Sequence, residues 1–335
     1  MLYILILTPE CNGSCIYCGG FEEGLMPKEL KFTIEDLKNF LSNDDKPSIA
    51  FYGGEPLLKL DVMIDIIDKV YAEHYILQTN GLLLHRLPKD YVREFSTILI
   101  SFDGRREVHN YYRGNYDKVL KNVKEIGKFF DGELIARMVA SRRTDIYEDV
   151  RHVISLNCFT HVHWQIDAVW CSRDGFDVWV EKYNRDVLRL FNFWIDEIGK
   201  GRIYNIVPFI GIATAFKKPF TYPPCSSGFE SFAITTDGKV LACPICPDLE
   251  WNVLGDLWKG FRVGVEILDP CPRCEFFSFC GGRCLFFNRE RLWGEDGFEK
   301  VCYTVKNLVK ALKSKINEIP DVTYPKFLNT TEIIP

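Results

Sequence analysis

The sequence predicts an α/β protein in which a partial, TIM-like barrel of six β-strand/α-helix repeats is followed by a small cysteine-rich domain. Through the first two-thirds of the chain, short apolar runs alternate with amphipathic stretches, which is typical of parallel strands joined by helical crossovers. After about residue 208 long periodic helices disappear, and Gly, Pro and Cys become dense from residue 223 to 302. Six repeats are fewer than the eight that close a full barrel, so the predicted barrel keeps an open side.

The expected elements follow one another in alternation. Short apolar runs are expected to form six strands, at 2–7, 49–52, 75–79, 98–102, 134–140 and 161–166. Amphipathic stretches are expected to form six helices, at 33–41, 62–71, 88–95, 116–130, 146–156 and 178–198, the first of them capped by Thr33. A last helix is expected over 301–316. We therefore expect the barrel at 1–218, the cysteine-rich domain with its C-terminal helix at 219–319, and an irregular tail at 320–335.

Composition narrows the class of protein. The chain of 335 residues is 47% hydrophobic and carries a net charge of −5, so no basic face is implied and nucleic acid is not an expected partner. No segment is long and apolar enough to span a membrane, and the apolar run at 2–7 lacks the basic start of a signal peptide. We expect a cytoplasmic protein without a membrane partner. In that compartment, 13 cysteines indicate metal ligands rather than disulfides.

Three of these cysteines lie in one short loop. Cys11, Cys15 and Cys18 form the pattern CxxxCxxC directly after the first expected strand. Three thiolates this close in sequence can wrap a cubane iron–sulfur cluster, and the missing fourth ligand leaves one iron open to a small molecule. A zinc knuckle with a distant fourth ligand, or plain core cysteines, are the alternatives.

Three more motifs stand at the ends of the next expected strands. They are YGGEP at 52–56, QTNG at 78–81 and ISFDG at 100–104. The carboxyl ends of the strands are where α/β barrels build their sites. Glycines allow a backbone to approach a ligand closely, and a carboxylate accepts hydrogen bonds from an ammonium group. The alternative for a Gly-Gly pair is an ordinary tight turn.

The cysteine triplet and these three motifs, in this order, resemble the radical S-adenosylmethionine (SAM) superfamily. The resemblance implies that the open iron binds the amino and carboxylate groups of SAM, and that one electron cleaves SAM to methionine and a 5′-deoxyadenosyl radical. This radical then takes a hydrogen atom from the substrate. The implied SAM contacts are Tyr17 near the adenine, Glu55 on the amino group with its neighbours Gly53, Gly54 and Pro56, Asn80 and Ser101 on the ribose or carboxylate, and Arg113 on the carboxylate. For Arg113, a solvated loop arginine is an equal alternative.

The later cysteines have a second specific spacing. It reads C-x12-G-x4-C, then C-x2-C-x5-C-x3-C, then x17-C, and resembles the seven-cysteine SPASM domain of radical SAM enzymes that modify peptides and proteins. The resemblance implies two auxiliary 4Fe–4S clusters, three clusters in all. The distal cluster would be held by Cys271, Cys274, Cys280 and Cys302, and the nearer one by Cys225, Cys243 and Cys284. Cys246 is the candidate fourth ligand of the nearer cluster, with an open site as the other option. Zinc is the alternative at both sites.

Polar side chains alternate along the sixth expected strand. His161, His163, Gln165 and Asp167 share one face because side chains alternate along a strand, while the other face is apolar and suited to covering helices. We expect the polar face to point into the barrel, where His161, His163 and Asp167 are candidate catalytic residues. An internal hydrogen-bond network without a catalytic role is an equal alternative. Arg137 on the fifth strand is a weaker candidate.

The leading hypothesis is a radical SAM/SPASM enzyme that modifies a peptide or small protein by hydrogen-atom abstraction, with auxiliary clusters that take up electrons or bind substrate. A ferredoxin or flavodoxin is the expected electron donor. Sulfatase-maturing enzymes resemble this architecture but carry an Asp after the second SPASM cysteine, where this chain has Pro244, which argues against formylglycine formation. We expect no added domain to grip a leader peptide, which removes one support for a peptide substrate. The alternatives are oxidation of a small molecule, and a non-catalytic electron carrier or zinc-stabilised binding module.

Overall fold

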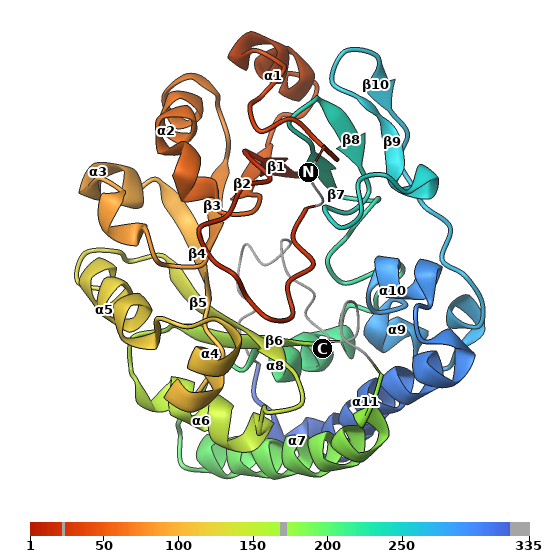
Figure 1. Ribbon diagram of the computed structural model, residues 1–335. Helices are drawn as coiled ribbons and strands as arrows, with labels where there is room; N and C mark the ends of the chain where they lie inside the picture. The colour runs from red at the N-terminus through yellow and green to blue at the C-terminus, as the bar shows by residue number, and fades with distance from the viewer. Residues whose placement is uncertain (22–23, 168–172, 322–335) are drawn as a thin grey trace. The chain divides into compact units, whose positions relative to one another are not determined.

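The computed structural model describes residues 1–21, 24–167 and 173–321 (Figure 1). The chain forms two compact units. The first comprises Met1–Ser101, Arg113–Leu134 and Ser226–Glu266, and the second comprises Phe102–Tyr112, Ile135–Cys225 and Ile267–Pro335. Each unit combines segments that are distant in sequence. The expected division into 1–218 and 219–319 follows the order of the sequence rather than contacts in space, and it stays a prediction. Of the expected tail at 320–335, the residues from 322 onward lie outside the described residues.

The first unit is built on a mixed sheet. Its strands lie in the order β10-β9-β8-β7-β1-β2-β3-β4. Pairing is parallel from β1 to β4 and between β1 and β7, and antiparallel from β7 to β10. The strands are β1 Leu2–Ile6, β2 Ser48–Tyr52, β3 His74–Thr79, β4 Phe95–Ser101, β7 Ser231–Ile234, β8 Lys239–Leu241, β9 Val253–Asp256 and β10 Gly260–Phe261.

Short helices lie outside the parallel strands of this unit (Figure 1). They are α1 Ile34–Leu41, α2 Leu60–Lys69, α3 Lys89–Val92 and α5 Tyr116–Ile126, with single turns η1 Pro56–Lys59, η2 Leu84–Arg86 and η3 Glu250–Asn252. The predicted cap of the first helix is confirmed. Thr33 accepts a hydrogen bond from the Asp36 N–H, and the Asp36 side chain accepts one from the Thr33 N–H, which is a reciprocal capping box.

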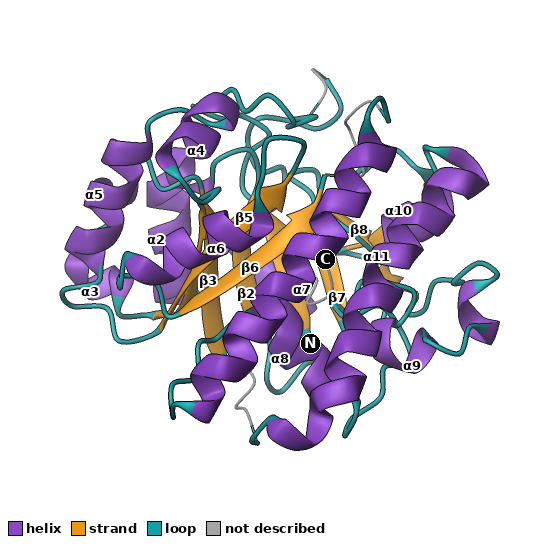
Figure 2. Cartoon of the chain, turned by 90° about the horizontal axis from the view of Figure 1, so that it is seen from below, coloured by secondary structure: helices purple, strands orange, loops and turns teal. Residues whose placement is uncertain are grey.

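The second unit pairs β5 Glu133–Ala140, which begins in the first unit, in parallel with β6 His161–Ile166. Its helices are α4 Arg106–Tyr112, α6 Ile146–Ser155, α7 Phe176–Gly199, α8 Val207–Ala215, α9 Phe277–Cys280, α10 Leu285–Glu290 and α11 Gly294–Lys315, with single turns η4 Cys271–Arg273 and η5 Ile316–Glu318. Helices α7 and α11 lie side by side (Figure 2), joined by Asn307, which donates to the carbonyl of Asn184.

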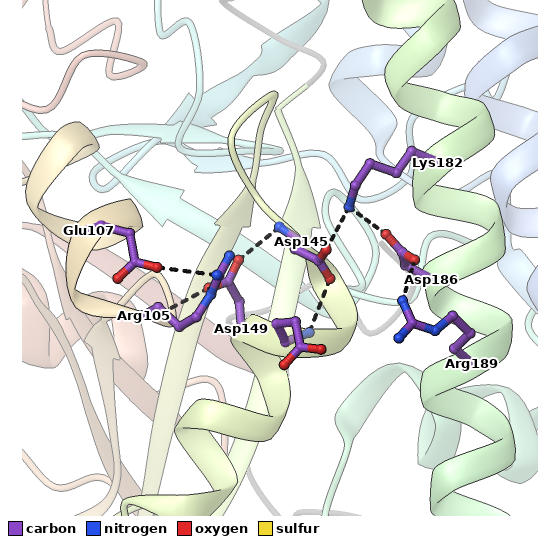
Figure 3. A network of polar contacts seen from close by, with 8 residues as sticks. Arg105, Glu107, Asp145, Asp149, Lys182, Asp186 and Arg189 are labelled. Carbon is purple, nitrogen blue, oxygen red and sulfur yellow. Dashed lines mark hydrogen bonds and ion pairs between the residues drawn. The ribbon is translucent and has the colours of Figure 1, made fainter.

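The apolar face of β6 is covered by a helix, as the alternation predicts. Trp164 is fully buried, and its indole N–H donates to the Tyr183 hydroxyl of α7 at 2.8 Å. Polar contacts join other elements of the same unit. Figure 3 shows Arg105, next to α4, on the buried Asp149 of α6, and Lys182 of α7 between Asp145 and Asp186. The α6 and α7 helices are therefore tied together through ion pairs as well as apolar packing.

The α/β class with parallel strands is confirmed, and all six expected strands form. The helix expected at 88–95 is wrong over its second half, because α3 ends at Val92 and β4 already begins at Phe95. Phe95 is buried and lies against Phe51 and opposite Tyr75, so packing in the sheet overrides the helical pattern. The sequence also gave no expectation of α4, of α8, or of strands β7–β10.

Within residues 1–21, 24–167 and 173–321, no helix combines the length and the apolar character that crossing a membrane requires.

Candidate functional site

The loop after β1 brings the first three cysteines together. The Cys18 N–H donates to the Cys15 carbonyl at 3.0 Å, and the Gly13 N–H donates to the Cys11 sulfur at 3.3 Å. Burial raises the pKa of the Cys11 thiol, and the nearby charges of Glu55 and Cys18 raise it further. Cys11 and Cys18 are therefore close enough to interact, as joint ligands of one group must be.

The Gly-Gly pair brings the end of β2 against the chain that leads into this loop. A Cβ at Gly53, whose φ is +146°, would collide with the Thr8 carbonyl, and a Cβ at Gly54 would collide with the Glu10 carbonyl. In their place, backbone hydrogen bonds form from Gly54 N–H to Thr8 O at 2.9 Å and from Glu55 N–H to Glu10 O at 2.8 Å. Glycine is thus required for this close approach of two backbones.

Glu55 is fully buried and its carboxylate already holds three hydrogen bonds. It accepts from the Thr79 hydroxyl at 2.7 Å, from the Asn80 N–H at 2.8 Å and from the Leu57 N–H at 3.1 Å. Burial raises its pKa, and these hydrogen bonds oppose that rise. The carboxylate thus ties η1 to the end of β3. The role on a SAM amino group, expected from the sequence, stays a prediction that this geometry does not favour.

Two predicted SAM contacts reach the cysteine loop itself. The Asn80 side chain donates to the Asn12 side-chain oxygen at 2.8 Å and to the Cys11 sulfur at 3.8 Å. Arg113 donates to the Cys15 sulfur at 3.8 Å, and its guanidinium lies 5.1 Å from the centre of the Tyr17 ring. The sequence therefore identified residues that do gather at this loop. Of the remaining predicted contacts, Pro56 is buried at the start of η1, and Ser101 is half-buried at the end of β4.

The candidate catalytic residues of β6 do not form one group. Asp167, at the carboxyl end, is buried and accepts a hydrogen bond from the Ser141 hydroxyl at 2.7 Å. His163 is fully buried in the strand, and Arg137 donates to Gln165 at 2.5 Å. His161 begins the strand, about 20 Å from Asp167 at the rise of an extended chain.

His161 thus lies at the opposite end of the strand from Asp167. It lines a cavity of about 100 Å³ with Phe159, Tyr204 and Asn205, and its ring nitrogen lies 2.8 Å from the Thr160 hydroxyl. Burial lowers the pKa of His161 to about 4, so its ring is neutral at pH 7. His161 and Asp167 therefore cannot act on the same substrate atom.

Four later cysteines of the second unit lie close to one another. Burial raises the pKa of Cys280 to about 12 and that of Cys302 to about 11, and in both cases Cys271 and Cys274 add to the rise. These four residues are the predicted distal set, and a group of thiols is the donor set that iron–sulfur clusters and zinc both take. Cys225 and Cys284 of the nearer set belong to the second unit, whereas Cys243 and Cys246 belong to the first.

Two buried asparagines that the sequence reasoning missed organise these cysteine loops. Asn252 accepts from the Cys243 N–H at 2.9 Å and donates to the carbonyls of Cys243, Ile245 and Cys246. Asn288 donates to the Cys271 sulfur at 3.4 Å. Asn288 lies inside α10, where asparagine is disfavoured, and that mismatch was the available signal. Among the described residues, no group of three or more His, Cys, Asp or Glu side chains has the geometry to hold a single metal ion.

Comparison with known proteins agrees with this arrangement. The sequence profile of the Radical SAM superfamily matches residues 5–155, which include the cysteine loop and the three strand-end motifs. A cysteine-type anaerobic sulfatase-maturating enzyme of Clostridium novyi is 25% identical over 326 residues, which cover 83% of this chain and 85% of that protein. The radical SAM cyclopropyl synthase TigE of Paramaledivibacter caminithermalis is 26% identical over 320 residues, which cover 84% of this chain and 67% of that protein.

The fold is also shared with a solved structure. Native anSMEcpe with bound AdoMet and the Cp18Cys peptide superimposes with a TM-score of 0.72 at 19% identity, covering 94% of this chain and 98% of that one. At this identity the likeness concerns the fold alone. Profile, relatives and cysteine loop lead to one conclusion: residues 5–155 carry a radical SAM domain, and the chain is similar to enzymes that use SAM and an iron–sulfur cluster.

Proposed function

We propose that this enzyme modifies a peptide or small protein by abstracting a hydrogen atom from it. The observation that carries the proposal is the loop after β1, which holds Cys11, Cys15 and Cys18 with no fourth cysteine beside them in sequence. Three thiols in one short loop are a donor set that a 4Fe–4S cluster takes, and Asn80 and Arg113 contact two of the sulfurs. When bound, such a cluster supplies the electron that cleaves SAM.

The chain's own residues would place SAM beside this loop. Gly53 and Gly54 hold the end of β2 against the backbone of Thr8 and Glu10, directly before the cysteine loop, and would thereby place this turn beside SAM. We assign Pro56 to the same turn and Ser101 to the neighbouring strand end. Tyr17, stacked under Arg113, offers an aromatic face to the adenine. We assign Glu55 a positioning role, since its carboxylate is occupied by Thr79 and Asn80.

We further propose two auxiliary 4Fe–4S clusters, which makes three clusters in all. The distal set is Cys271, Cys274, Cys280 and Cys302, which all lie in the second unit, and the Cys274 N–H donates to the Cys271 carbonyl at 3.0 Å. The nearer set is Cys225, Cys243 and Cys284, with Cys246 as fourth ligand. The support for Cys246 is Asn252, which contacts both Cys243 and Cys246 and holds them in one loop. These groups would supply an electron acceptor or a substrate ligand.

Closing a substrate radical to a stable product releases one electron and one proton. Asp167 is the proposed proton acceptor, because it is a buried carboxylate at a strand's carboxyl end with a neutral hydroxyl donor, Ser141. His163 lies four residues earlier on the same face of the strand and would line the same side of the site. For His161, a role in this step is not part of the proposal, given its distance from Asp167.

The peptide substrate is supported by the relatives. One is a sulfatase-maturating enzyme, and the solved structure of similar fold holds a peptide together with AdoMet. Pro244, directly after Cys243, leaves this chain without a carboxylate at the position where sulfatase-maturing enzymes carry their Asp, so we propose a modification other than formylglycine formation. We also propose a cytoplasmic location and a ferredoxin or flavodoxin as the source of electrons.

The substrate class can be tested by following deuterium. Anaerobically reconstituted enzyme is given SAM, a strong reductant and either deuterated peptides of mixed sequence or deuterated small alcohols and sugars. Deuterium in 5′-deoxyadenosine from the peptides only supports the proposal, because the abstracted atom marks its source. Deuterium from the small molecules only would contradict it and favour the alternative of small-molecule oxidation.

A further inference from the structure

Two asparagines each donate a side-chain N–H to a cysteine sulfur, and the two cysteines belong to different sets. Asn80, after β3 in the first unit, donates a side-chain N–H to the Cys11 sulfur at 3.8 Å. Asn288, in α10 of the second unit, donates one to the Cys271 sulfur at 3.4 Å. Each cysteine is the first of its motif in sequence. The same contact thus arises from unrelated elements of the fold.

Asn288 is held in one orientation by the backbone that leads to Cys271. Its side chain is 1% exposed and uses all its hydrogen-bonding groups locally: it accepts from the Leu268 N–H at 2.8 Å and donates to the Leu268 carbonyl at 3.1 Å. An apolar side chain would fill the volume without the cost of burying an amide. The amide instead fixes the backbone just before Cys271 and turns its remaining N–H towards the sulfur.

Asn80 is held in an equally definite orientation. Its backbone N–H donates to Glu55, and its side-chain oxygen accepts from the Leu82 N–H at 2.9 Å. With the oxygen engaged, the amide nitrogen must face the Asn12 side chain and Cys11. Arg113 contacts the same loop at the Cys15 sulfur. Side-chain N–H groups therefore contact two sulfurs of this loop, those of Cys11 and Cys15.

We propose that Asn80 and Asn288 are positioning residues that set the reduction potential of the iron–sulfur groups at Cys11 and Cys271. An N–H that points at a cysteine sulfur stabilises negative charge on that sulfur, and the reduced form of a cluster carries one negative charge more than the oxidised form. The hydrogen bond thus raises the potential. This inference rests on the proposed function, since it requires both sets to hold iron–sulfur clusters.

Four variants of the full chain test the proposal. Asn80→Asp and Asn288→Asp keep the shape and the acceptor oxygen but remove the N–H donors, whereas Asn80→Ala and Asn288→Ala remove the donors without adding charge. Asn39→Ala and Asn317→Ala are matched controls, because these asparagines are exposed in the first and second unit. Midpoint potentials are read by electron paramagnetic resonance during reductive titration, on the fraction of protein that carries iron.

The two clusters can be told apart. The SAM-binding cluster is the one whose signal changes when SAM is added. For Asn288, the variants are made in a chain whose Cys11, Cys15 and Cys18 are alanine, so that only the auxiliary signals remain. We expect both Asn80 variants to shift the SAM-binding midpoint to a more negative potential. Both Asn288 variants should shift one auxiliary midpoint the same way and leave the other in place.

Three results would contradict the proposal. Midpoints that move with Asp but not with Ala would show only the effect of an added charge and would overturn the proposal. Unchanged midpoints in a fully loaded parent would overturn it too, while leaving the proposed function intact. A parent that assembles no iron–sulfur cluster, or holds zinc at Cys271, would instead defeat the proposed function, and the inference with it.

Discussion

At the scale of single residues, a substitution at Glu55 distinguishes a structural role of its carboxylate from a role in binding SAM. We predict that Glu55→Gln lowers the free energy of unfolding by about 1–3 kcal/mol, because one amide oxygen cannot accept from Thr79, Asn80 and Leu57 while an N–H₂ group faces these donors. Urea unfolding followed by circular dichroism measures the change. Glu35→Gln, in the first turn of α1, is the control and should change stability little.

The opposite pattern would restore the role expected from the sequence. If Glu55→Gln keeps the stability of the parent but loses affinity for SAM in a binding titration, the carboxylate contacts SAM and is not a structural clamp. The sequence identifies the motif but does not decide between these two roles, because it does not show that Thr79 and Asn80 donate hydrogen bonds to the carboxylate.

Asp167 carries the second prediction at this scale. We expect Asp167→Asn to lower product formation by about 10²-fold or more, the usual range for losing a general base, while 5′-deoxyadenosine still forms. Mass spectrometry of the substrate and chromatography of the nucleoside measure the two yields. Ser141→Ala, which keeps the carboxylate, should lose less. An equal loss of product and nucleoside in Asp167→Asn would assign the residue to SAM binding or folding instead.

At the scale of elements, the network in Figure 3 ties α6 to the start of α4. Asp149 is fully buried and accepts from the Arg105 backbone and side chain and from the Asp145 N–H. We predict that Asp149→Asn lowers the free energy of unfolding by about 2–3 kcal/mol, since an amide N–H₂ must face an N–H donor and Arg105 keeps only the exposed Glu107 as a charged partner.

A neighbouring pair in the same network provides the control. The Lys182 side chain is 45% exposed, so its ion pairs with Asp145 and Asp186 are screened by water, and Lys182→Met should cost about 1 kcal/mol or less. Urea unfolding of both variants gives the comparison. Equal losses would show that burial does not decide the strength of these contacts.

The C-terminal end of α7 gives a pH dependence. The side chains of Arg202 and Lys200 lower the pKa of Glu197 to about 2. A lowered pKa in the folded state stabilises the protein above the ordinary Glu value of about 4.5, and this contribution disappears as pH falls towards 2. We expect Glu197→Gln to be less stable than the parent at pH 7 and to approach it as the pH falls from 4.5. Thermal unfolding of the metal-free chains measures this, and parallel curves would contradict it.

Helices and strands could be predicted where apolar residues recur with a regular period in the sequence. The alternation of strand 161–166 was enough to assign Trp164 to the helix-covered face. Helix α8 was missed because it is apolar on every side and nearly all its residues are buried, so it shows no periodicity. Strands β7–β10 were missed because they have two to four residues each, too few for a pattern to register.

At the scale of the whole molecule, spacing predicts sets of cysteines but not how the chain is divided in space. The four cysteines of the distal set fall in one compact unit, and Cys11, Cys15 and Cys18 in the other. The segment 226–266 joins the first unit because β7 pairs with β1, a contact between residues more than 200 positions apart. Such a pairing depends on tertiary packing, which local sequence patterns do not encode.

The measurement that tests the central claim most directly is the formation of 5′-deoxyadenosine. Protein is purified and reconstituted without oxygen, then given SAM and a strong reductant. A variant with Cys11, Cys15 and Cys18 changed to Ala runs beside it, with Cys158→Ala as control for loss of a cysteine outside the motifs. We expect the nucleoside from the parent and the control and none from the triple variant. A fully iron-loaded parent that forms no nucleoside would contradict the account.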